Sequence, residues 1–185
     1  MRVDPITELK DIKNIKKLLD DNPRDKLIFV MGVNSGLRVQ DLLQLRVDDV
    51  KNAEIAERII LRERKTGKDN VFIVNSEIKI ALDAYLLSAN LRGDQYLFKS
   101  RKGYNYPINT HVVTRLVKKW TSAINLKGNY GAHSLRKTWC YHQRKTFGVP
   151  WEVLAKRLNH STPAITMLYL GIQQEEVEAI LLNTI

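Results

Sequence analysis

Residues 130–171 read YGAHSLRKTWCYHQRKTFGVPWEVLAKRLNHSTPAITMLYLG, and the interpretation of the chain starts from this stretch. It contains three of the four histidines, together with Arg136 and Tyr169. His133 and Arg136 are three residues apart, so they share one face of a helix or of its first turn. Such a pair can hold one phosphate, the arginine through its planar guanidinium and the histidine through a ring nitrogen.

The second half of the stretch places a histidine ahead of a tyrosine. The run Asn-His-Ser-Thr-Pro around His160 predicts a loop that leads into a new helix, because proline favours the first helical turn. Tyr169 follows nine residues later, about two and a half helical turns on. A tyrosine hydroxyl with a pKa of about 10 is a poor nucleophile by itself. A cluster of arginine and histidine beside it makes it a credible one.

The composition indicates a basic protein from a reducing compartment. The chain has 185 residues, 30 basic and 20 acidic, with a net charge of +10 and a pI of about 9.7. This charge indicates a polyanionic partner, nucleic acid rather than a membrane surface. One cysteine excludes a disulfide framework, and neither a long apolar run nor a signal-peptide pattern is present. We therefore expect a soluble protein of the cytoplasm, associated with the nucleoid.

Apolar periodicity predicts a mainly α fold with a small antiparallel β-hairpin, an α+β chain that forms one domain over residues 1–185. Breaks at Asn22-Pro23 and Ser35-Gly36 separate the first helices. The expected hairpin covers 57–74, and Tyr96-Leu97-Phe98 is expected to be a short strand. The expected helices cover residues 5–21, 24–35, 37–45, 76–90, 109–125, 134–147, 151–158, 163–170 and 173–182.

Two more positions stand out beside these elements. Arg38 follows the Ser-Gly break at the start of a helix, and Asp41 three residues later is placed to hold its guanidinium. Lys65 lies beside the hairpin turn. Each of these residues alone is most often a solvated surface residue, so their order along the chain carries the argument.

Four segments in that order resemble the catalytic domain of the tyrosine recombinases, the phage-integrase family. They are SGLRVQDLLQLRVDDV at 35–50, RKTGKDNVFIV at 64–74, AHSLRKTW at 132–139 and LNHSTPAITMLYLG at 158–171. The resemblance covers nearly the whole chain and implies the DNA breaking-rejoining fold of that domain.

The resemblance also implies a role for each matched residue. Arg38 and Arg136 match the pair that clamps the phosphate, and Asp41 matches the acid that supports the first arginine. Lys65 matches the lysine of the hairpin. His133 and His160 match the first and second histidines, the second being a position that some members fill with tryptophan, and Tyr169 matches the nucleophile.

The implied reaction is transesterification on double-stranded DNA without a metal or other cofactor. Tyr169 would displace a 5′-hydroxyl and form a 3′-phosphotyrosyl link, with Lys65 suited to protonate the leaving oxygen. His133 is suited to accept the tyrosine proton and His160 to donate to the phosphate, although the sequence leaves these two roles open. The resemblance further implies a tetramer on DNA, with room for accessory DNA-binding factors.

Two departures from the family pattern are visible. The chain reads Leu-Asn-His at 158–160 where the family more often has Leu-Gly-His, and asparagine also tolerates a left-handed turn. The N-terminal core-binding domain that many members carry is not expected within residues 1–185, and the sequence leaves open whether the chain is an excised fragment or a naturally short member. The last segment, 173–185, is amphipathic and is expected to pack either on its own chain or on a neighbouring copy.

Further basic residues are expected to contact DNA phosphates, which positions the duplex without specifying its sequence. These candidates are Arg64, Lys68, Arg115, Lys118, Lys119, Lys137, Arg144 and Lys145.

Three other functions remain open at this point. A type IB topoisomerase would share the nicking step and replace strand exchange by DNA rotation. A non-catalytic DNA-binding module would keep the fold and form no covalent adduct. A phosphatase-like His/Arg enzyme is the third, and its own nucleophile signature is missing.

Overall fold

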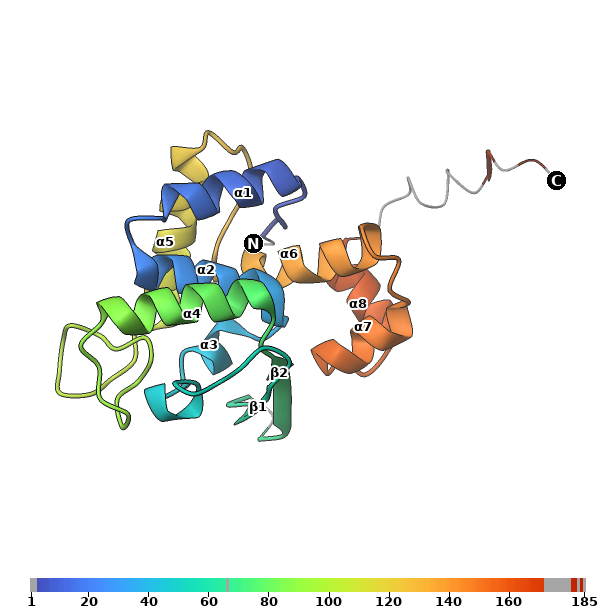
Figure 1. Cartoon of the computed structure of the whole chain (residues 1–185). Helices are drawn as coiled ribbons and strands as arrows, with labels where there is room; N and C mark the ends of the chain where they lie inside the picture. The colour runs from blue at the N-terminus through green and yellow to red at the C-terminus, as the bar shows by residue number, and fades with distance from the viewer. Residues whose placement is uncertain (1–2, 66, 172–180, 183, 185) are drawn as a thin grey trace. The chain divides into compact units, whose positions relative to one another are not determined.

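The computed structural model describes residues 3–65, 67–171, 181, 182 and 184 (Figure 1). The chain divides into two compact units, Met1–Trp139 and Cys140–Ile185.

The predicted fold, mainly α with one antiparallel hairpin, is confirmed. Within the described residues, no helix is both long and apolar enough to cross a membrane. The elements in chain order are α1 (Leu9–Leu18), α2 (Pro23–Ser35), α3 (Val39–Leu42), the 3-10 turn η1 (Val47–Asp49), β1 (Arg58–Arg62), β2 (Asp69–Ile73), α4 (Ser76–Ser88), α5 (Thr110–Ala123), α6 (Ala132–Lys145), α7 (Trp151–Leu158) and α8 (Pro163–Leu170).

Three helices of the first unit start at an asparagine cap. In each case the asparagine side chain accepts a hydrogen bond from the backbone N–H three residues later, which satisfies one of the unpaired donors of a helix N-terminus. This contact is worth about 1 kcal/mol of stability per cap. The capping pairs are Asn22 with Asp25, Asn75 with Ile78 and Asn109 with Val112.

Helix α2 lies at the centre of the first unit. All six residues from Leu27 to Gly32 are buried, so this helix has no solvated face along two turns. Figure 1 shows α4 beside it, and the two helices are in contact. On another side, the Phe29 ring meets Trp120 of α5 edge to face at a centroid distance of 5.9 Å.

Two glycines let the end of α2 approach the first half of α6. A Cβ on Gly32 would lie 2.6 Å from Leu135 Cδ1, and a Cβ on Gly36 would lie 2.9 Å from the Trp139 ring. Gly36 also caps α2 with a left-handed backbone, at φ 66°. The two contacts are four residues apart on both segments, 32 to 36 and 135 to 139, which is about one helical turn.

The hairpin pairs Arg58 with Ile73 and Arg62 with Asp69 at its two ends. Its inward side chains alternate with exposed ones, as expected of a strand pair with one buried face. Beyond β1, the Glu63 N–H donates to the Lys68 carbonyl and the Gly67 N–H to the Glu63 carbonyl, both at 2.9 Å. These bonds close the turn that carries Lys65.

Some expected elements differ from those observed. The prediction of a strand at 96–98 is wrong. Tyr96 forms an isolated β-bridge with Arg46, and Leu97 and Phe98 are buried in the core although their segment is irregular. The first and third helices are shorter than predicted, since apolar residues outside them are buried without being helical, as Ile6 is. The expected helix over 173–182 and the segment 173–185 fall almost wholly outside the described residues.

In the second unit, α7 and α8 pack against each other. Asn159 ends α7 in the left-handed conformation, with φ 53° and ψ 41°. This agrees with the expectation that asparagine tolerates a left-handed turn where the family more often has glycine. Thr162 then caps α8 by accepting from the Ile165 N–H, and Pro163 occupies the first helical position.

The glycine contact gives a first prediction. Replacing Gly32 with alanine should lower the free energy of unfolding by about 1–3 kcal/mol, because the added methyl overlaps Leu135. At an unobstructed helical site the same change would raise stability by about 0.5–1 kcal/mol. Urea unfolding followed by circular dichroism measures the difference.

The control for this experiment is Asn14→Ala on the exposed face of α1. It should change stability by less than about 0.5 kcal/mol. A Gly32→Ala protein more stable than its parent would contradict the close approach of the two helices.

Candidate active site

Arg38 follows the Gly36 turn and precedes α3. Its backbone is extended, at φ −70° and ψ 136°, and its side chain is largely covered. Its Nη1 atom lies 2.8 Å from Glu63 Oε2 and 3.9 Å from Asp41 Oδ2. Two acidic side chains therefore flank one guanidinium.

Asp41 is placed close to Arg38, as predicted, but the nearer partner of the arginine is Glu63. The Oδ1 atom of Asp41 accepts the Arg64 N–H at 2.9 Å, which ties the hairpin to α3. Burial raises the pKa of Asp41, and the neighbouring Glu63 raises it further, against the lowering effect of the Arg64 hydrogen bond and of the arginines.

Glu63 is a buried acid of this site that was not predicted from the sequence. Its side chain is fully buried, and its Oε1 accepts a hydrogen bond from Asn70 Nδ2 at 2.5 Å. The signal was available in the alternation of β1, because Ile59, Leu61 and Glu63 follow one another at a spacing of two on the covered side. An ionisable residue at an inward strand position is uncommon and marks a site with a partner.

His133 and Arg136 lie on the first two turns of α6, as predicted. Arg136 is buried and His133 is exposed. Partial desolvation lowers the pKa of His133, and four neighbouring cations lower it further. In order of effect after desolvation, these cations are Arg136, Arg38, Lys137 and Lys65.

Lys65 lies in the turn of the hairpin and is exposed. The turn is fixed by the backbone bonds of Glu63 to Gly67 and Lys68 and by the Arg64 N–H bond to Asp41. Its charge acts on His133, so the fold brings residues from the hairpin, the Gly36 turn and α6 into one region of the first unit.

The two remaining predicted site residues, His160 and Tyr169, belong to the second unit and lie next to each other. Their rings meet edge to face at 5.3 Å. His160 Nδ1 lies 2.9 Å from Thr166 Oγ1, and its backbone N–H donates to the Ala155 carbonyl. These contacts fix the ring orientation of His160 beside the hydroxyl-bearing ring on α8.

Most of the predicted phosphate-contacting residues are at the surface, and one is not. Lys137 is buried, since α6 has no exposed residue between Ser134 and Thr138, and its assignment as a phosphate contact stays a prediction. Arg144 is partly covered and stacks over the Trp151 ring at 4.8 Å. The exposed ones are Arg64, Lys68, Arg115, Lys118, Lys119 and Lys145.

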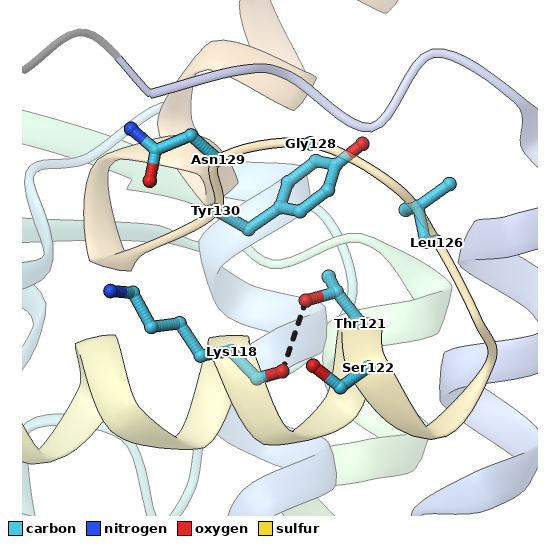
Figure 2. Close-up of a pocket in the computed structure, with 7 residues that line it drawn as sticks. All are labelled: Lys118, Thr121, Ser122, Leu126, Gly128, Asn129 and Tyr130. Carbon is cyan, nitrogen blue, oxygen red and sulfur yellow. Dashed lines mark hydrogen bonds between the residues drawn. The ribbon is translucent and has the colours of Figure 1, made fainter.

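A hollow of about 230 Å³ lies at the end of α5 and in the loop after it (Figure 2). Among the predicted residues it includes Lys118, whose carbonyl accepts a hydrogen bond from the Thr121 hydroxyl at 3.2 Å. Tyr130 and Gly128 form another part of its lining. The arginines and histidines of the first unit's cluster do not line it.

Within residues 3–65, 67–171, 181, 182 and 184, no three His, Cys, Asp or Glu side chains gather as metal ligands would. The two buried acids of the cluster, Asp41 and Glu63, instead lie against an arginine. This donor set is suited to orienting a guanidinium.

Comparison with known proteins identifies a family. The model of the phage integrase family matches residues 6–176. The probable integrase/recombinase YoeC of Bacillus subtilis (strain 168) is 35% identical over 179 residues, 96% of this chain and 94% of YoeC. A tyrosine recombinase of Pseudothermotoga lettingae is 32% identical over 170 residues, 90% of this chain and 57% of that protein.

A solved structure shares the fold. The XerH site-specific recombinase, in a post-cleavage complex with its palindromic difH substrate, superimposes with a TM-score of 0.77 at 16% identity. The match covers 98% of this chain and 53% of XerH. The chain thus spans nearly all of YoeC but little more than half of the other two proteins.

The cation cluster around His133 gives a prediction for its titration. The pKa of His133, followed by NMR of its imidazole Cε1–Hε1 group and assigned with His133→Gln, should fall below the ordinary value of about 6.5. Removing a neighbouring charge with Lys65→Gln should raise it, whereas Lys10→Gln on α1 should not. A pKa unchanged by Lys65→Gln would contradict the proximity of the two side chains.

The same shift sets the sign of its effect on stability. The folded protein disfavours the protonated ring, so this group should lower the free energy of unfolding as pH falls through the unfolded pKa of about 6.5 towards the lower folded value. The contribution should be absent above that range.

Proposed function

Since this chain belongs to the phage integrase family, we propose that it is the catalytic part of a site-specific tyrosine recombinase that cuts and rejoins DNA through Tyr169. The observation that carries the proposal is the convergence of Arg38, Arg136 and His133 in one region of the first unit. The printed name of YoeC, a probable integrase/recombinase, and the DNA bound by XerH support the same activity.

In the proposed step, the Tyr169 oxygen attacks a backbone phosphorus. The new bond is a 3′-phosphotyrosyl ester, and the bond to the 5′ oxygen breaks. The tyrosine loses its proton and the leaving 5′ oxygen gains one, so no external energy source is required. Attack by a 5′-hydroxyl from another strand reverses the step and joins the strands.

Negative charge develops on the non-bridging oxygens during this attack. Arg38 and Arg136 are permanently charged donors that can be directed at those oxygens before the reaction starts. Both are largely covered by protein, which strengthens their effect compared with solvated side chains. We assign them to the phosphate clamp.

Proton transfer is assigned to the side chains that can change charge. Lys65 can give up a proton, which an arginine cannot, so it is the proposed donor to the 5′ oxygen. The lowered pKa of His133 keeps its ring neutral near pH 7, as a proton acceptor for Tyr169 requires. His160, with Nδ1 held by Thr166, is the proposed hydrogen-bond donor to the phosphate.

The proposed partner is double-stranded DNA, on which four copies would assemble at the nucleoid, with or without accessory DNA-binding factors. The net charge of +10 and the exposed cations of α5 and of the hairpin support phosphate contacts. A topoisomerase-like activity shares the nicking step, and no observation favours it over recombination. A purely DNA-binding role is the outcome that the first experiment below would reveal.

The nucleophile is tested by covalent capture. The protein is incubated with nicked duplexes from the DNA around its gene and quenched in SDS, and the protein–DNA adduct is measured on a gel. The parent should form the adduct and Tyr169→Phe should not, because the phenyl ring lacks the attacking oxygen. EDTA should leave the yield unchanged, since no step uses a metal.

Tyr141→Phe on α6 is the matched control and should retain the adduct. An adduct that persists in Tyr169→Phe would move the nucleophile to another residue. Parent protein that binds these duplexes without forming any adduct would favour the DNA-binding module.

The clamp is tested by Arg38→Ala. Losing one preorganised donor to the developing charge typically costs about 2.7–4 kcal/mol of transition-state stabilisation, so adduct formation should slow by about 10²–10³-fold. The control is Arg58→Ala, which removes an exposed arginine from β1. Single-turnover rates with saturating duplex separate this effect from DNA affinity, and an Arg38→Ala protein as fast as its parent would refute the assignment.

A further inference from the structure

We propose that Glu63 is a positioning residue that holds Arg38 in place and joins it to the hairpin turn carrying Lys65. The inference depends on the proposed function, since it concerns how that site is assembled. Glu63 is not among the residues to which the family resemblance assigns a role.

Both carboxylate oxygens of Glu63 have a defined partner. Oε2 lies 2.8 Å from Arg38 Nη1, and Oε1 accepts the Asn70 Nδ2–H bond at 2.5 Å. The Glu63 side chain is fully buried and Asn70 is 8% exposed. The carboxylate is therefore fixed by strand β2 on one side and fixes the guanidinium on the other.

The alternative acid for Arg38 is farther away. Asp41 Oδ2 lies 3.9 Å from the same Nη1 atom, and the other oxygen of Asp41 accepts the Arg64 N–H. If Glu63 lost its charge, the remaining attraction on Arg38 would come from Asp41. The guanidinium would then move away from the position in which Glu63 holds it.

Glu63 also begins the turn that presents Lys65. Its N–H and its carbonyl form the two backbone bonds that close residues 63–68 into this turn. The next residue, Arg64, is bonded through its N–H to Asp41. The turn is thus attached to the Arg38 region at two consecutive positions, so the proposed phosphate clamp and the proposed proton donor share one support.

The cost of burying this charge argues for a role beyond packing. Ile59 and Leu61 precede Glu63 on the covered side of the strand, and an apolar residue would continue their pattern. Replacing a buried ion pair by apolar residues is often neutral or stabilising, so packing alone does not require a glutamate here. Orientation of a neighbouring cation does require one.

The test compares Glu63→Gln with its parent in the covalent-capture assay at saturating duplex. The rate should fall about 10- to 100-fold, as expected when a reacting group is displaced by about 1 Å, whereas the dissociation constant for the duplex should stay within about threefold. In an Arg38→Ala background, Glu63→Gln should cause no further loss, because the residue acts through Arg38.

Asp69→Asn is the matched control, since it removes an exposed negative charge from the same hairpin. It should retain the parental rate. Glu63→Met separates packing from positioning: a folded, stable protein with a slow capture rate supports the proposal, and a fast one overturns it.

A second measurement is independent of catalysis. Urea unfolding of Glu63→Gln, Arg38→Gln and the double variant forms a double-mutant cycle, in which the double variant should lose less stability than the sum of the single losses. Additive losses would refute the contact itself. An active parent with an equally active Glu63→Gln variant would refute the positioning role alone, whereas a parent that forms no adduct would refute the proposed function and the role with it.

Discussion

The close approach of α2 and α6 is the constraint on which the rest of the first unit depends. Gly32 and Gly36 meet Leu135 and Trp139 at distances that leave no space for a methyl group. The contact is possible only because both glycines lack a Cβ, and Gly36 can also turn the chain with a positive φ. Arg38 follows this turn directly, and Arg136 lies between the two facing residues of α6. A packing contact without any charge therefore sets where the charged site can form.

The side chains of this site carry more positive than negative charge. Arginine, lysine and histidine side chains from three segments approach one another, and the two buried acids lie against Arg38. Positive charges held together without a ligand repel one another, and a phosphate diester would relieve this repulsion. Desolvation and the same surplus both lower the pKa of His133. The charges that favour an anion therefore also disfavour protonation of this ring.

Much of this arrangement could be predicted from the sequence, for reasons that were local. The β-rich runs around Lys65, the His-x-x-Arg spacing and the left-handed Asn159 each follow from a few adjacent residues. Glu63 was missed because charged residues near a hairpin turn are usually solvated, and only its pairing with Arg38, 25 positions earlier in the chain, explains its burial. The burial of Lys137 was likewise not visible in the sequence. Both cases concern tertiary burial, which periodicity alone does not determine.

The glycine contact also has a consequence for protein engineering. A library that diversifies this chain can vary the exposed residues of α5 with little effect on stability, because substitutions at solvated positions usually change it by less than about 0.5 kcal/mol. Positions 32, 36, 135 and 139 must instead be kept, or exchanged as facing pairs, since enlarging one side requires shrinking the other. Directed diversity is therefore best confined to the solvated faces.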